Sequence, residues 1–382
     1  MQQEKPKIGL ILSGGGARAA YQVGVLKAIC EFLPKDARNP FPIICGTSAG
    51  AINSAAIAIY GANFHEAVNR LLRVWRNFQT EKVFRADPVG IIKSGAHWLL
   101  ALFLGGLGKY NPTSLLDRSP LRRLLTHYMP CERIQESIDN GVIDALGITA
   151  SGYTSGQSLT FYQGKDSITS WRRVRRLGSR SNITVDHLMA SSAIPFIFSA
   201  VKVHREFFGD GSMRQTAPLS PALHLGAERI LVIGVTNEND LQAERIQDTG
   251  YPSLAQIASH ILNSIFLDAM EADLERLRRI NKTITLIPSH QLEEQGTFLR
   301  KVEVLVISPS DDLQELANKH AFRLPRTIRY LLRGIGAFNK RGSSLVSYLL
   351  FEKYFTRELI SLGYADTMQR KDEVVQFLGL EP

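Results

Sequence analysis

The chain has 382 residues, 44% of them hydrophobic and 21% charged, a composition that argues against global disorder and supports a large core without disulfide or metal staples. Three widely spaced cysteines, Cys30, Cys45 and Cys131, form no C-x-x-C pair, which argues against a disulfide framework or zinc knuckle and favours a reducing compartment. The net charge of +9 favours anionic partners, namely nucleic acid, acidic lipid headgroups or acidic substrates, without choosing among them.

The first 60 residues alternate between buried strands and helices. We expect strands at Ile8–Leu12 and Pro42–Cys45, and helices at Ala19–Phe32 and Ala49–Tyr60. This order is typical of a parallel α/β sheet. The apolar run at Ile8–Leu12 is too short for a signal sequence, and no apolar segment reaches the roughly 18 residues of a membrane span. We therefore expect a cytoplasmic location.

The rest of the chain continues the α/β pattern and then becomes helical. Further helices are expected at Phe64–Phe78, Ser119–Tyr128, Val185–Ser191 and Ser253–Ile280, and further strands at Ile143–Ala150, Leu159–Tyr162, Arg229–Val235, Thr283–Ile287 and Val302–Ile307. From Asp311 onward the pattern indicates helices only. We predict one main domain at residues 1–310 and a C-terminal helical extension at residues 311–382.

A G-x-S-x-G motif lies between the second strand and its helix, at Gly46-Thr47-Ser48-Ala49-Gly50. A strand-to-helix turn this tight leaves no room for side chains at its flanks, which explains the two glycines. The turn presents the hydroxyl of Ser48 at a helix N-terminus, where the helix dipole favours a developing negative charge. By chance alone the motif is common, so its context carries the prediction that Ser48 is a nucleophile.

A glycine-rich loop follows the first strand at Gly14, Gly15 and Gly16. Glycines allow backbone N–H groups to converge on one point, as the oxyanion hole of an acyl-transfer enzyme requires. We expect the neighbouring Arg18 either to brace this loop or to contact a lipid headgroup. The alternative is a nucleotide site, because Gly14-x-Gly16-x-x-Ala19 satisfies a dinucleotide-binding pattern. The acidic residue that this pattern needs after the second strand is replaced by the serine turn.

A serine nucleophile needs a base, and none of the nine histidines lies in a recognisable motif. Asp210, in Phe207-Phe208-Gly209-Asp210-Gly211-Ser212, is the better candidate, since it follows a small-residue segment at Ala190–Pro195 that allows close approach to another loop. Asp-Gly alone is more often a hairpin turn. Burial is expected to raise the pKa of Asp210 and so make it a better base.

These motifs together, in this order, resemble the patatin-like phospholipase family over roughly Lys7 to Val235. The resemblance implies a three-layer α/β/α fold with a mainly parallel sheet, and a Ser–Asp dyad that hydrolyses lipid acyl esters without a cofactor or metal. It assigns Ser48 as nucleophile, Asp210 as base and Gly14, Gly15 and Gly16 as oxyanion hole. The chain departs from the family pattern at Ala19 and Ser212, where small residues replace other small residues.

Three other interpretations stay open. The first is an α/β-hydrolase with a Ser–His–Asp triad, its histidine being a late one such as His260, His290 or His320. The second is a nucleotide-binding protein that uses the first glycine loop. The third is a non-catalytic module that binds lipid or nucleic acid. Each predicts a different response to replacement of Ser48 or a histidine.

Two segments are candidates for membrane contact. Ser94 to Gly108 is the most apolar stretch of the chain, and it fits an interfacial anchor or lid as well as a helix buried in the core. Arg172 to Arg180, preceded by Trp171, is a dense basic patch that suits anionic headgroups or nucleic acid, although such runs are most often solvated faces. With the esterase motifs present, we expect lipid rather than nucleic acid.

Overall fold

The structure, a computed structural model, describes residues 6–87, 96–97, 100, 103–104, 114–237, 253–288, 299–338 and 343–380. It contains one sheet with the strand order β10-β9-β1-β2-β3-β4-β6-β5. In addition, β8 pairs with β3, and β7 pairs with β8. The strands are β1 (Ile8–Leu12), β2 (Ile43–Thr47), β3 (Ala145–Gly152), β4 (Ser158–Gly164), β5 (Trp171–Arg173), β6 (Arg176–Arg180), β7 (Val201–Val203), β8 (Glu206–Asp210), β9 (Arg229–Ile233) and β10 (Glu303–Ile307). The half from β10 to β3 is entirely parallel, and antiparallel hairpins extend the other half.

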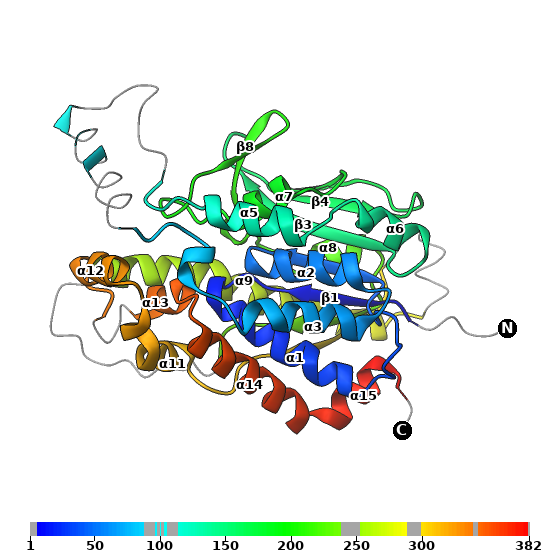
Figure 1. The fold of residues 1–382 in the computed structure, drawn as a ribbon. Coiled ribbons are helices and arrows are strands. Elements are labelled where there is room, and N and C mark those ends of the chain that lie inside the picture. The colour runs from blue at the N-terminus through cyan, green and yellow to red at the C-terminus, as the bar shows by residue number, and fades with distance from the viewer. Residues whose placement is uncertain are drawn as a thin grey trace.

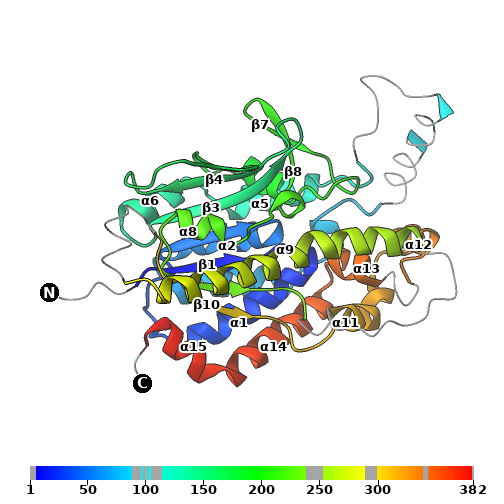
Figure 2. The same cartoon turned by 180° about the vertical axis from the view of Figure 1, so that it is seen from behind.

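Helices cover both faces of this sheet (Figures 1 and 2). They are α1 (Ala20–Glu31), α2 (Ala49–Tyr60), α3 (Phe64–Trp75), α5 (Ser119–Tyr128), α6 (Arg133–Asp139), α7 (Val185–Ser191), α8 (Ser220–His224), α9 (Leu254–Thr285), α11 (Leu313–His320), α12 (Arg326–Gly334), α13 (Ser343–Leu349), α14 (Lys353–Gln369) and α15 (Lys371–Leu378). Short 3₁₀ turns are η1 (Gly16–Ala19), η2 (Thr80–Lys82), η4 (Gly211–Arg214) and η6 (Ala321–Arg323).

The strands alternate their side chains between two apolar cores. Leu10 and Leu12 of β1 face the core that includes α1, α2, α3 and α14, whereas Ile11 faces the core beneath α8 and α9. Successive strand residues point to opposite faces, so a strand covered on both sides must be apolar throughout. The predicted three-layer α/β/α fold with a mainly parallel sheet is confirmed.

The prediction of a strand at Thr283–Ile287 is wrong, because α9 continues to Thr285 and the last two residues form the turn that follows it. Ile284 is 8% exposed, as is Leu277 two helical turns earlier, so both lie on the buried face of α9. Leu286 is 79% exposed, just beyond the helix end. The β-branched residues suggested a strand, but packing at helical spacing decides the structure.

The C-terminal helices pack against the beginning of the chain. A Cβ on Gly24 of α1 would lie 2.1 Å from the carbonyl oxygen of Ile360, and one on Gly363 of α14 would lie 2.2 Å from that of Tyr21. The Tyr21 hydroxyl donates a hydrogen bond of 2.9 Å to Asp366. The two helices therefore cross at backbone contact, which only glycine allows. The division at residue 310 stays a prediction.

Among the described residues, no helix combines the length and apolar character that crossing a bilayer would require.

Candidate active site

The G-x-S-x-G turn joins β2 to α2 in a strained conformation. Ser48 has φ 55° and ψ −128°, a backbone geometry that residues with a side chain seldom adopt. A Cβ on Gly50 would lie 2.2 Å from the carbonyl oxygen of Leu12, and one on Gly46 would lie 2.4 Å from the Ser54 hydroxyl. Both distances are far below van der Waals contact, so the steric reason expected for the two glycines is confirmed.

The register of the sheet brings Asp210 to the same place as Ser48. Thr47, the last residue of β2, is opposite Thr149 of β3, and Asp210, the last residue of β8, is opposite the next residue, Ala150. Strand β3 pairs with β4 along one of its edges. Along the other edge it pairs first with β2 and then, toward its C-terminal end, with β8. The two strands therefore meet end to end, and the serine turn and the carboxylate begin at their junction.

The carboxyl group of Asp210 is buried and incompletely paired. Asp210 is 1% exposed; its Oδ1 accepts a hydrogen bond of 3.0 Å from the backbone N–H of Ser212, while Oδ2 has no hydrogen-bond partner among the described residues. Burial raises the pKa of Asp210 to about 6, against the opposing effects of the Ser48 hydroxyl, Ser212 and the positive charge of Arg118. The effect of the Ser48 hydroxyl on the pKa of Asp210 indicates that the two side chains are near each other.

Two further residues support this junction, and the sequence analysis did not single them out. The backbone N–H of Ser48 donates to the hydroxyl of Ser191 at 2.9 Å, and that hydroxyl donates to the Thr149 carbonyl at 2.6 Å. Arg118 is 3% exposed and donates to the Met189 carbonyl at 3.0 Å. Ser191 lies in the small-residue segment expected to approach another loop, whereas no motif marks Arg118.

The first glycine loop is shaped by the C-terminal part of the chain. Gly16 has φ +55°, and a Cβ there would lie 2.3 Å from the carbonyl oxygen of Tyr348 in α13. A Cβ on Gly15 would lie 2.5 Å from Cγ2 of Val235. Gly16 lines the same cavity as Ser48, whereas Gly14 lines a separate small cavity together with Thr47. Of the three glycines expected to form an oxyanion hole, Gly16 is the one that lines the cavity with Ser48.

Arg18 is buried under this loop and reaches no surface. It has no exposed area, its Nε donates to the Ser347 hydroxyl at 2.8 Å, and its Nη2 donates to the Ser344 hydroxyl at 3.1 Å. The guanidinium also lies 4.3 Å from the ring centroid of Tyr348. Of the two roles expected for Arg18, this geometry favours bracing the loop over contact with a headgroup.

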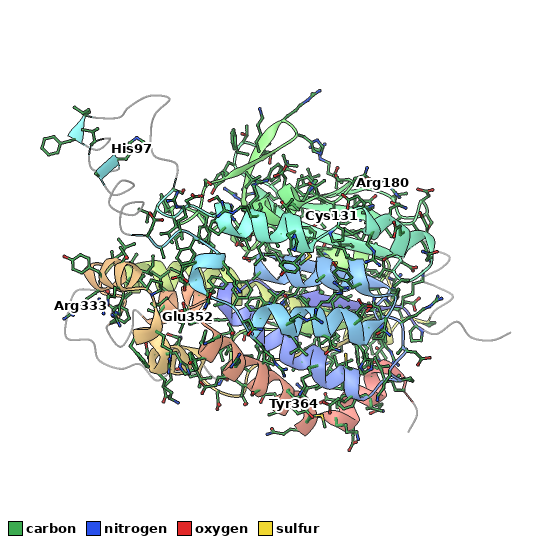
Figure 3. All side chains as sticks on the ribbon, in the orientation of Figure 1. His97, Cys131, Arg180, Arg333, Glu352 and Tyr364 are labelled. Carbon is green, nitrogen blue, oxygen red and sulfur yellow. The ribbon has the colours of Figure 1, made fainter. Side chains whose placement is uncertain are left out.

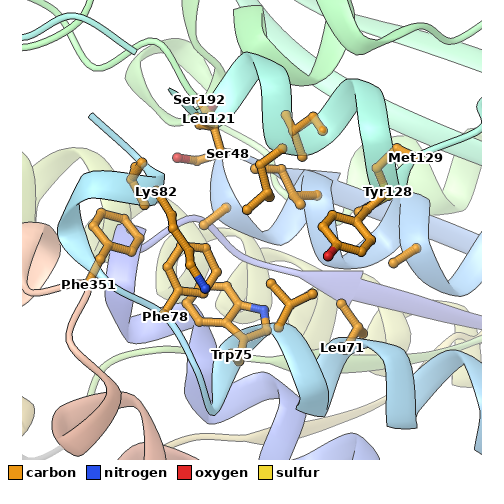
Figure 4. Close-up of a pocket in the computed structure, with 18 of the residues that line it drawn as sticks. Ser48, Leu71, Trp75, Phe78, Lys82, Leu121, Tyr128, Met129, Ser192 and Phe351 are labelled. Atoms are coloured by element: carbon orange, nitrogen blue, oxygen red, sulfur yellow. The ribbon is translucent and has the colours of Figure 1, made fainter. Parts of the chain in front are cut away.

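A cavity of about 320 Å³ extends from Ser48 along one side of α2 (Figure 4). Its floor is the helix face that carries Ala49, Ile52, Ala56 and Tyr60. Opposite this floor the lining comes from α3, α5 and the C-terminal part of the chain, and includes the apolar residues Leu71, Trp75, Phe78, Leu121, Leu125 and Phe351. A concave site lined mainly by apolar side chains, with a few polar groups among them, is typical of a ligand pocket.

The late histidines proposed for a triad are not at this site as far as the structure describes them. His320 pairs with Glu358 of α14, and His260 is an exposed residue of α9. His290 lies outside the described residues. Among those described, no histidine lines the cavity that holds Ser48.

The segments expected to contact a membrane are described only in part. Of Ser94 to Gly108, most lies outside the described residues; within it, Phe103 is 93% exposed. Arg172 to Arg180 forms the β5–β6 hairpin, whose preceding Trp171 is buried between the rings of Tyr162 and His224. Arg180 donates to the backbone carbonyls of Gly164, Lys165 and Ile168. The exposed arginines of this segment are Arg172, Arg173, Arg175 and Arg180.

Comparison with known proteins identifies one family. A sequence profile described as patatin-like phospholipase matches residues 10–223, which is more than half of the chain. The chain is 26% identical over 228 residues to the uncharacterized protein YjjU of Escherichia coli (strain K12), covering 59% of this chain and 51% of YjjU. It is also 26% identical over 215 residues to a cGAMP-activated phospholipase of Pseudomonas aeruginosa, covering 56% of this chain and 55% of that protein.

The chain spans about half the length of these two curated relatives. Among solved structures, human GIVD cytosolic phospholipase A2 superposes with a TM-score of 0.42 and 13% identity, over 98% of this chain and 59% of the human one.

Proposed function

Because the chain belongs to the patatin-like phospholipase family, we propose that it is a lipid acyl hydrolase in which Ser48 is the nucleophile and Asp210 the base. The observation that carries this proposal is the junction of β2 and β8, where a strained serine and a buried carboxylate with an unpaired oxygen begin side by side. An unpaired buried carboxylate oxygen is unfavourable and calls for an explanation, which a proton-transfer role supplies.

The proposed reaction proceeds in two steps. Asp210 accepts the hydroxyl proton as the oxygen of Ser48 attacks the ester carbonyl, and backbone N–H groups of the loop Gly14–Gly16 stabilise the oxyanion. The tetrahedral intermediate then expels the alcohol, which takes the proton from Asp210, and leaves an acyl-enzyme. In the second step Asp210 takes a proton from water as the water oxygen attacks the acyl carbonyl. The intermediate then releases the fatty acid while Asp210 returns that proton to the Ser48 oxygen.

A pKa of about 6 suits Asp210 to this task. A general base works best when its pKa is near the working pH while it is still mostly ionised. An unperturbed aspartate, with a pKa of about 3.9, would be a much weaker base. Esters fit this chemistry better than amides, because an alcohol is the better leaving group.

The apolar cavity supports a fatty acyl substrate. From Ser48 to Tyr60 the floor of α2 is 12 residues long, or about 18 Å at 1.5 Å per residue. An extended methylene chain advances about 1.25 Å per carbon, so the cavity length corresponds to roughly 14 carbons. Since such substrates reside in bilayers, we propose that the enzyme works while peripherally bound to a membrane surface.

Labelling with a fluorophosphonate, which reacts with activated serines, tests the proposal. We expect labelling of the wild type, none of Ser48→Ala and greatly slowed labelling of Asp210→Asn. Ser361→Ala on α14 and Asp186→Asn on α7 are matched controls at positions away from the cavity and should be labelled normally. Undiminished labelling or ester turnover in Ser48→Ala would overturn the assignment.

A further inference from the structure

The C-terminal region contains a basic block, by which we mean the stretch between Glu315 and Glu352, where basic residues occur and acidic residues do not. Between Glu315 and Glu352 the chain has seven lysine and arginine residues and neither aspartate nor glutamate. The whole chain has a net charge of +9, so this stretch holds most of the excess positive charge. A block of this kind attracts anionic surfaces and is not neutralised by its own neighbours along the sequence.

Helix α12 arranges part of this block as one outward face. Arg326, Arg329 and Arg333 follow each other at intervals of three and four residues, which places them on one side of the helix. The opposite side carries Ile328 and Leu332, which are 1% and 2% exposed. The arginine side of α12 is therefore the side that the core leaves uncovered.

Aromatic side chains accompany the arginines. Tyr330 is 83% exposed, Phe322 60% and Phe338 36%, and all three line an open groove together with Arg326 and Arg333. Rings and guanidinium groups that share a surface suit the boundary between lipid headgroups and acyl chains.

These arginines have no acidic partners in the described part of the chain. Arg326 and Arg333 are exposed and form no ion pair there, and Arg329 donates to the backbone carbonyl of Phe322 at 2.6 Å. By contrast, Arg180 at the end of the β5–β6 hairpin pairs with Asp166 and binds backbone carbonyls. The charge of α12 thus remains available to a partner.

The position of α12 relates this face to the cavity. The helix lies at the end of the molecule opposite to the two chain termini (Figures 1 and 2). The parallel strands run toward that end, so Ser48, which follows β2, lies there as well. In Figure 3, Arg333 projects at the same end as His97. Close to His97 in sequence, Leu100, Phe103 and Leu104 are also exposed.

We propose that the outward face of α12, formed by Phe322, Arg326, Arg329, Tyr330, Arg333 and Phe338, docks the protein onto bilayers rich in anionic phospholipid. The proposal rests on the proposed function, because lipid is favoured over other polyanions by the location of this face at the substrate end. Arginines neutralise headgroup phosphates while the rings enter the interface. Docking in this way places the Ser48 end of the cavity on the side of the protein nearer the lipid.

Vesicle flotation with the full chain tests the docking face. We compare vesicles of phosphatidylcholine alone with vesicles that also contain phosphatidylglycerol. The wild type should bind the anionic vesicles much more tightly, and less so at high salt. Loss of two basic side chains in R326Q/R333Q should weaken this binding about 30-fold, at about 1 kcal/mol for each basic residue near the surface. R172Q/R173Q on the β5–β6 hairpin removes the same charge and should leave binding nearly unchanged.

Further measurements separate this proposal from the proposed function. R326Q/R333Q should unfold at the wild-type temperature and should hydrolyse a dispersed short-chain ester at the wild-type rate, since neither residue lines the cavity. Equal binding to both kinds of vesicle, equal loss in R172Q/R173Q, or loss of oligonucleotide binding with vesicle binding intact would each overturn the docking face. Absence of Ser48-dependent ester hydrolysis would instead contradict the proposed function, whatever the vesicles show.

Discussion

The two strand-to-helix turns of the site are built in different ways. The glycines of the serine turn at Gly46–Gly50 are constrained by β1 and the first turns of α2, although the Ser48 N–H is also held by the distant Ser191 hydroxyl. The glycine loop at Gly14–Gly16 is constrained by Tyr348 and by the Ser344 and Ser347 hydroxyls that hold Arg18. The first turn is a local structure, whereas the second depends on a segment more than 300 residues away. Mutations should therefore affect the two turns differently.

The largest effect is expected from replacing Asp210, the proposed general base for Ser48. Asp210→Asn should lower kcat/KM on a short-chain ester by about 10⁴-fold, since an amide cannot accept the hydroxyl proton. The same change should raise the free energy of unfolding at pH 8 by on the order of 2 kcal/mol. The folded state binds a proton to Asp210 more tightly than the unfolded state does, so stability falls as pH rises from about 4 to about 6, and asparagine removes that loss.

Kinetics and chemical denaturation at pH 5 and pH 8 measure both effects, with Asp186→Asn as control. Decreased stability of Asp210→Asn at pH 8 would contradict the view that the carboxylate is an uncompensated buried charge.

Adding a methyl group to each turn in separate variants should show that the serine turn and the glycine loop differ in their effect on stability. Gly50→Ala places a Cβ 2.2 Å from a backbone carbonyl of β1, so the central sheet must shift, and we expect a loss of about 3 kcal/mol or more in unfolding free energy. Gly16→Ala places a Cβ 2.3 Å from the carbonyl oxygen of Tyr348 in the short helix α13, which can shift without moving the sheet, so we expect a smaller loss of stability with nearly complete loss of ester turnover. Thermal unfolding and turnover, measured side by side, check the contrast; equal loss of stability in both variants would remove it.

Replacement of Arg18 should act on the loop through the C-terminal helices. Arg18→Met keeps the length of the side chain but leaves the Ser344 and Ser347 hydroxyls without this donor, and we expect about 2–3 kcal/mol of destabilisation. Ser347→Ala removes one of the two contacts and should cost about 1 kcal/mol. Denaturant unfolding with a double-mutant cycle measures the coupling, and strictly additive effects would argue against it.

The floor of the cavity belongs to the helix of the local turn, so a change there should alter selectivity and leave the turn intact. Ala56 lies 8 residues from Ser48, or about 12 Å along α2. Ala56→Trp should exclude acyl chains longer than about 10 carbons and lower their kcat/KM by roughly 10–100-fold, while butyryl esters react as before. A series of esters of increasing chain length checks this, and a uniform decrease for all lengths would contradict it.

The smallest effect is the pH dependence of the intact site. Since the ionised form of Asp210 is the proposed base and burial raises its pKa to about 6, kcat/KM should fall tenfold for each pH unit well below 6 and level off above it. Ser347→Ala should not move this inflection, because it acts on the other turn. A pH profile with an inflection near 4 would indicate that burial does not tune the carboxylate.

The same contrast explains what could be predicted from the sequence. The serine turn was predictable because its glycines, its strand and its helix lie within 20 residues. Asp210 could be located only through its order among other motifs, since its approach to Ser48 depends on the shared edge of β3. The contacts of α13 with the glycine loop could not be predicted, because nothing in the sequence of α13 marks Tyr348 as a neighbour of Gly16 or Ser347 as a partner of Arg18.

Errors elsewhere have the same origin. The sequence groups Trp171 with the arginines that follow it, but stacking against Tyr162 and His224 buries the ring. The sequence around α12 predicts a helix and no more, because the role of its arginines depends on which face the core leaves exposed. In both cases packing between distant elements decides which side chains reach the surface.

The dependence of Gly16 on Tyr348 also sets an order of events during synthesis. At about 5–20 residues per second, the 300 residues that separate Ser48 from Tyr348 take roughly 15–60 s to translate. Throughout that interval the nascent chain contains the serine turn but lacks the α13 residues that pack against the glycine loop. For the proposed hydrolase we therefore expect ester turnover to require α13 and to begin only after that helix has been synthesised.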